Sequence, residues 1–171
     1  RVLFRSSTYY LDFPDAVTAH PFNEFSDLGV YDRCITRGLL ASILPTAYNM
    51  GNQILQVPGA VIVRNEMIHE TRVIPVGSQP HVGGKIRQYL GDSRGHWEGT
   101  TLVVETTNFN GKVGITRNGN TLPTSQDLKI VERFERVAEG TLQYTATVTD
   151  PKTWTRPWTV SLPLTRHPEY E

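Results

Sequence analysis

The sequence predicts a mainly β protein, either an antiparallel β-sandwich or a lipocalin-like barrel, with an irregular N-terminal arm. After residue 50 the chain consists largely of short stretches rich in β-branched residues, separated by turn signals. Glycine occurs 14 times and proline 11 times in 171 residues, which is typical of a chain with many turns. We therefore expect one domain, in which an arm over residues 1–50 packs on an antiparallel β domain over residues 51–171.

The first 50 residues predict little regular structure. Short strands could form over residues 1–4 and 8–11, and residues 36–49 have room for one short helix. Pro14, Pro21 and Pro45 interrupt any longer helix. Four apolar residues of the candidate helix form a candidate protein-contact patch: Leu39, Leu40, Ile43 and Leu44.

The middle of the chain predicts strands from residue 53 onward. Residues 60–74 are rich in valine and isoleucine and predict one long bent strand, or two strands broken near Asn65. Residues 86–90 are a further candidate strand, and residues 91–95 predict a loop. Residues 96–107 predict a hairpin that turns at Gly99, and residues 109–126 predict a long polar surface loop.

The clearest pattern lies in the last third of the chain. Residues 128–137 and 141–150 predict two strands joined by a glycine-containing loop. In the second strand every other residue is apolar, which indicates one buried and one exposed face. The alternation continues over residues 154–164, where Pro157 and Pro163 indicate an edge strand or a strand with one unpaired side.

The charge balance argues against two classes of function. The chain has 17 Lys+Arg and 17 Asp+Glu, whereas a nucleic-acid binder or a polybasic membrane anchor needs a basic excess. No apolar stretch is long enough to predict a membrane-spanning helix. No cofactor fingerprint or metal-ligand spacing stands out, so we expect neither a cofactor nor a metal.

Three local features resemble chemical motifs. Residues 91–95 fit G-x-S-x-G, but no helix is expected to follow, as a nucleophile elbow requires. Glu66 and His69 have the Glu-x-x-His spacing of helical metal sites, but their segment predicts a strand. Cys34, the single cysteine, is interpreted as a buried thiol, as half of a disulfide with a partner outside this sequence, or as a catalytic thiolate.

Arg156 is predicted to lie on the apolar face of its strand. A guanidinium in that position needs a buried carboxylate partner, or it recognises an anion inside a cavity. Candidate carboxylates for the pair are Glu132, Glu98 and Glu66.

Several charged residues would converge in one lumen if the sheet closed. For an enzyme, the candidate catalytic residues are His69, Glu66, His81, Asp92 and Arg94. The candidate binding residues are Arg72, Glu98, Arg156, Trp154, Trp158 and Trp97.

Five stretches in order carry a resemblance to a known family. They are DRC at 32–34, EMIHETRVIP at 66–75, GDSRGHWEG at 91–99, LVVETTNF at 102–109 and DPKTWTRPW at 150–158. Together they resemble a large family of exported bacterial proteins, abundant in Acidobacteria, for which no activity is established. The resemblance covers roughly residues 30–170. It implies export, a compact β-rich fold and a further cysteine beyond residue 170 as the partner of Cys34.

These observations leave three hypotheses about function. The favoured one is a non-catalytic periplasmic or extracellular domain that contacts protein partners as an accessory subunit of a larger assembly, such as one at a membrane. The second is a small enzyme, a hydrolase, isomerase or lyase, with an acid–base site for an anionic small molecule. The third is a lipocalin-like carrier of an apolar small-molecule ligand, which requires a dry cavity of about 300 Å³ or more.

Overall fold

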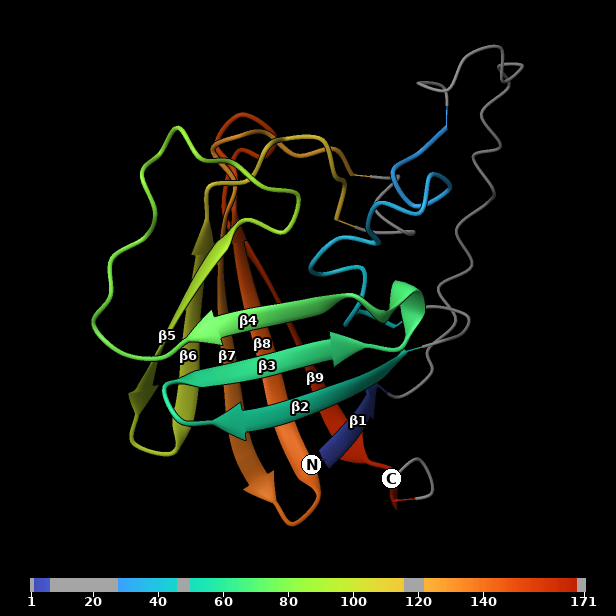
Figure 1. Ribbon diagram of the computed structural model, residues 1–171, viewed down its shortest axis with the longest axis vertical. Helices are drawn as coiled ribbons and strands as arrows, with labels where there is room; N and C mark the ends of the chain where they lie inside the picture. Colours follow the sequence, from blue (N-terminus) through green and yellow to red (C-terminus); the bar gives the residue numbers. More distant parts are fainter. Residues whose placement is uncertain (1, 7–27, 46–49, 116–121, 169–171) are drawn as a thin grey trace.

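The computed structural model describes residues 2–6, 28–45, 50–115 and 122–168 (Figure 1). Within these ranges the strands form one antiparallel sheet in the order β4-β3-β2-β1-β9-β8-β7-β6-β5. The strands are β1 (Val2–Ser6), β2 (Gly51–Val57), β3 (Ala60–Asn65), β4 (Thr71–Pro75), β5 (Asp92–Glu98), β6 (Thr101–Thr107), β7 (Lys129–Ala138), β8 (Thr141–Thr149) and β9 (Trp158–Arg166).

The sheet folds into two packed layers. One layer holds β2–β4, the other holds β5–β9, and β1 joins them by pairing with both β2 and β9. Figure 1 shows β2–β4 crossing the longer strands at a steep angle instead of running along them. On the far side the layers meet where Val76 bridges Gly95. The described parts of β4 and β5 form no ladder, so the protein is a β-sandwich and the predicted alternative of a closed lipocalin-like barrel is wrong.

Several predicted elements are confirmed. β7 and β8 pair from Lys129–Thr149 to Ala138–Thr141. On the predicted inward face of β8, Tyr144, Ala146 and Val148 are buried and Leu142 is half-buried. The apolar run over residues 60–74 divides after Asn65 into β3 and β4. β5 and β6 turn at Gly99, whose φ of 59° suits glycine.

Other elements differ from the prediction. Residues 91–95 are not a loop, because β5 begins at Asp92. Residues 86–90 make only an isolated bridge between Gln88 and Phe109, and the described residues 36–45 form turns instead of a helix. β9 begins at Trp158 and not near residue 154, since residues 151–157 form turns and bends. The buried carboxylate of Asp150 holds this turn, accepting bonds from Ser125 Oγ at 2.7 Å and Thr153 Oγ1 at 2.9 Å.

The two ends of the sandwich are different. Residues 28–45, blue to cyan in Figure 1, close one end: Leu39, Leu40 and Ile43 are buried in the core, and Leu44 packs against it. The predicted surface patch at these residues is therefore wrong. The β5–β6 and β7–β8 hairpins lie at the other end, at the bottom of Figure 1. Among the described residues no helix is long and apolar enough to cross a membrane.

Candidate functional site

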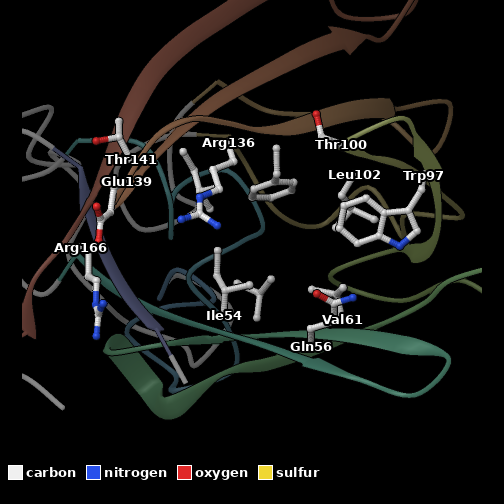
Figure 2. A pocket seen from close by; sticks show the side chains of 14 residues that line it. Ile54, Gln56, Val61, Trp97, Thr100, Leu102, Arg136, Glu139, Thr141 and Arg166 are labelled. Atoms are coloured by element: carbon white, nitrogen blue, oxygen red, sulfur yellow. The ribbon is translucent and has the colours of Figure 1, made fainter.

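A cavity of about 510 Å³ opens between the layers near the two hairpins. Ligand pockets typically enclose roughly 300–1,000 Å³, so the volume suits a small organic molecule. Its floor is apolar because inward-facing side chains of both layers meet there: Ile54, Val61, Val63, Leu102, Phe134 and Leu142. Figure 2 shows Ile54 and Val61 on one side of the space and Leu102 on the other.

The mouth of the cavity is polar. Its lining includes Gln56, Thr100, Arg136, Glu139, Thr141 and Arg166. Figure 2 shows the guanidinium of Arg136 directed into the space above Ile54. Trp97 also lines the cavity and is 45% exposed, so one indole stands where a ligand would enter. An apolar floor with a polar mouth is the arrangement expected for an amphipathic ligand.

A buried ionic group lies behind the floor. The ring of Phe134 lies 5.0 Å from that of Tyr144, and the Tyr144 hydroxyl donates to Glu132 Oε1 at 3.0 Å. Both terminal nitrogens of Arg72 donate to the same carboxylate, at 2.5 and 3.0 Å. Arg72 is 7% exposed, and the other two side chains are fully buried. None of the three lines the cavity.

The charges of this group are matched. Burial opposes the positive charge of Arg72, but the attraction of Glu132, the hydrogen bonds to it and smaller contributions from Tyr144 and Glu70 together outweigh burial and raise the pKa of the guanidinium. Burial raises the pKa of Tyr144 well above its ordinary value, so the phenol stays neutral and donates. The carboxylate thus accepts three bonds, so the group leaves no unpaired charge behind the floor for a ligand to contact.

The buried arginine predicted from the sequence is a different residue. Arg156 is exposed in the turn before β9, so its predicted place on the apolar face is wrong. Arg72 takes the buried carboxylate instead, and that carboxylate is Glu132, one of the predicted partners. Trp154 and Trp158 pack edge to face at 5.7 Å and against the core, away from the cavity lining.

Three of the candidate catalytic residues do come together, at the start of β5. His81 Nδ1 lies 2.7 Å from Asp92 Oδ2, and Arg94 pairs with Asp92 at 2.9 Å. His81 Nε2 lies 3.5 Å from Glu105 Oε1, so both ring nitrogens face carboxylates. The same group holds the loop before β5, because Asp92 accepts from the Val82 N–H and Arg94 Nε donates to the Pro80 carbonyl. None of these residues lines the cavity, and their contacts fix a loop.

The other two candidate catalytic residues lie in a turn between β3 and β4. Met67–His69 form a 3₁₀ turn (η2), so the predicted strand there is wrong. Glu66 Oε2 accepts from the Gly51 N–H at 2.9 Å, and His69 is exposed. In the described part of the chain no group of three or more His, Cys, Asp or Glu residues is arranged to hold a metal.

Two further candidates have ordinary structural settings. Glu98 pairs with Arg133 at 2.8 Å and with His96 at 3.2 Å at the tip of the β5–β6 hairpin, and these contacts lower its pKa. Cys34 is exposed, so its interpretation as a buried thiol is wrong. The predicted convergence of charged side chains in one lumen is therefore not present: they divide between the ionic group, the loop contacts, η2 and the hairpin tip.

Ser93 does not occupy a nucleophile elbow. It lies within β5, is buried and bonds to Thr106 across the sheet at 2.9 Å. A nucleophile elbow needs an exposed serine at a strand-to-helix turn. The G-x-S-x-G match at residues 91–95 is therefore structural.

The chain matches no family model, no curated protein and no solved structure. The resemblance to exported bacterial proteins and the predicted location outside the cytoplasm consequently stay predictions. The cavity itself was missed at the sequence level, apart from Trp97. The alternation of side chains along β7 could have placed Arg136 in the cavity. Glu132, Phe134 and Arg136 point to the inner face of this strand, whereas Arg133 and Glu135 point outward.

Glu70 carries a prediction about stability. Burial raises its pKa, although the Thr36 hydroxyl and the Arg37 backbone N–H donate to it, and its Oε2 has no hydrogen-bond partner in the described chain. Asn65, which bonds to the Glu70 carbonyl, also has a buried side-chain oxygen without a partner. We expect Glu70→Gln to stabilise the protein by about 1 kcal/mol near pH 7, because it removes a desolvated charge.

The pH dependence of this gain identifies its cause. A carboxyl whose pKa is raised by folding destabilises the native state fully above the folded pKa, and the cost disappears below the unfolded pKa. The advantage of the variant should therefore shrink in urea unfolding at about pH 3 compared with pH 7. An equal advantage at both values would show that charge burial is not the source.

Proposed function

We propose that the protein binds an apolar or amphipathic small molecule between its two layers, as a carrier or ligand-binding domain. The observation that supports this function is the open cavity of about 510 Å³ with an aliphatic and aromatic floor. Its volume exceeds the minimum of about 300 Å³ that a carrier requires. The acid–base enzyme finds less support, because none of the five candidate catalytic residues lines this cavity. The accessory-subunit hypothesis stays a prediction.

Binding can be followed with dodecanol, an uncharged long-chain alcohol whose affinity depends only on contacts with the apolar floor of the cavity. We expect saturable heat in titration calorimetry and a change in tryptophan emission. The emission change should disappear in Trp97→Phe while the heat persists, since Trp154 and Trp158 lie outside the cavity lining. Absence of both signals at saturating dodecanol would refute the proposed function.

A blocking variant tests the location of the ligand. Ile54→Trp on β2 should fill part of the cavity and weaken dodecanol binding at least about tenfold, which corresponds to about 1.4 kcal/mol. Val57→Trp is the matched control, because Val57 lies on the same strand, is 40% exposed and does not line the cavity. Both variants should keep the wild-type unfolding transition. Equal affinities of the two variants would place the ligand elsewhere.

A further inference from the structure

One arginine at the cavity mouth, Arg136, has no partner in the described part of the chain. Arg136 makes no hydrogen bond or ion pair with the described part of the chain, although it is directed into the cavity. Arg133, three residues earlier on the opposite face of β7, pairs with Glu98 at 2.8 Å. Arg94 pairs with Asp92 at 2.9 Å. A guanidinium that faces an apolar floor and is paired with no carboxylate of the protein can bind the carboxylate of a ligand.

The interior of the cavity cannot receive a charged group. Its floor is built from hydrocarbon side chains, so an ion there would lose its hydration without replacement. Behind the floor, both terminal nitrogens of Arg72 and the Tyr144 hydroxyl already donate to Glu132. A ligand charge therefore has to stay at the mouth, and the apolar part has to point inward.

The charge at the mouth favours a single negative charge. The guanidinium of Arg136 is directed into the cavity, and Glu139, the carboxylate in the lining, forms no ion pair with it in the described part of the chain. We propose that the natural ligand is a long-chain monocarboxylate whose carboxylate pairs with Arg136 and whose chain lies on the floor beside Val61 and Phe134. This inference rests on the proposed function, and it adds the chemical class of the ligand and its orientation.

The test compares three chains of equal length that differ only in the head group: dodecanoate, dodecanol and dodecylamine. Calorimetry on the wild-type protein should show dodecanoate binding about tenfold more tightly than dodecanol, with dodecylamine weakest, because a charge-assisted bond to a guanidinium adds to the same chain contacts. In Arg136→Gln the preference for dodecanoate over dodecanol should vanish while dodecanol affinity stays unchanged. Arg133→Gln is the matched control and should retain the preference.

The outcomes separate this inference from the proposed function. If no chain binds, the proposed function fails. If dodecanol binds as tightly as dodecanoate, the cavity binds apolar molecules and the monocarboxylate is refuted. If Arg136→Gln keeps the preference for dodecanoate, the ligand carboxylate pairs with another group and its proposed pairing with Arg136 is refuted. Tighter binding of dodecylamine would show that Glu139 determines selectivity. Arg136 is exposed, so the variant should fold, and an unchanged melting curve confirms this.

Discussion

Glu132→Gln is expected to destabilise the protein by about 3–5 kcal/mol, a large share of the stability of a domain of this size. The substitution removes the charge that compensates Arg72 at a site where neither side chain reaches solvent appreciably. It also changes the acceptor of the Tyr144 hydroxyl. Urea unfolding at neutral pH measures the loss, and Arg72→Met should cost a similar amount because it leaves the Glu132 carboxylate unpaired.

A second comparison distinguishes a structural pair from a general loss of packing. Arg72→Met combined with Glu132→Leu should recover most of the stability, since two uncharged side chains replace the pair. Adding Tyr144→Phe should recover more, because it removes a hydroxyl left without an acceptor. The exposed pair of Arg133 and Glu98 is the control, and its removal should have little effect. A double variant as unstable as the single ones would contradict this account.

Gly91→Ala is the second substitution with a large expected effect, a loss of about 3 kcal/mol. Gly91 has a φ of +69°, and a Cβ there would lie 2.5 Å from the Thr107 carbonyl oxygen and 2.8 Å from Thr106 Cγ2. Both atoms belong to β6, which is paired on both sides and cannot retreat. Thermal or urea unfolding measures the loss.

Gly99→Ala separates the two causes of this loss. Gly99 has a φ of +59°, but nothing lies within 4 Å of a Cβ built there. Gly99→Ala should lower the free energy of unfolding by only about 1 kcal/mol, which is the cost of a positive φ in alanine. A similar cost for both alanines would show that the crowding at Gly91 is relieved by local movement.

The strands were predicted well where one side-chain period ran without interruption. Along β8 the alternation of Tyr144, Ala146 and Val148 with polar residues marks both the strand and its buried face. The prediction failed at residues 154–157, where Trp154 and Arg156 continue the alternation through a turn. The turn depends on Ser125, which is remote in sequence and bonds to Asp150. A local pattern does not contain that contact.

The candidate site was less predictable because it depends on how the layers cross. Arg72 shares the inward parity of Ile74, but Val73 on the other face is also apolar and is 56% exposed, so the alternation did not mark the buried face of β4. The pairing of Arg72 with Glu132 was not predictable either, because the two residues are 60 positions apart and on opposite layers. Likewise the cavity arises where β2 and β3 pass over the ends of β6–β8, and no motif marks that crossing.

The division of the sandwich into a filled end and an open end has a consequence for protein engineering. Gln56, Thr100 and Arg136 line the mouth and are exposed, whereas the residues that close the opposite end are part of the core. Randomising the mouth should therefore leave most library members folded, because surface substitutions usually change stability by less than about 0.5 kcal/mol. The scaffold is thus suited to directed evolution of new ligand preferences, with selection acting on recognition and hardly on folding.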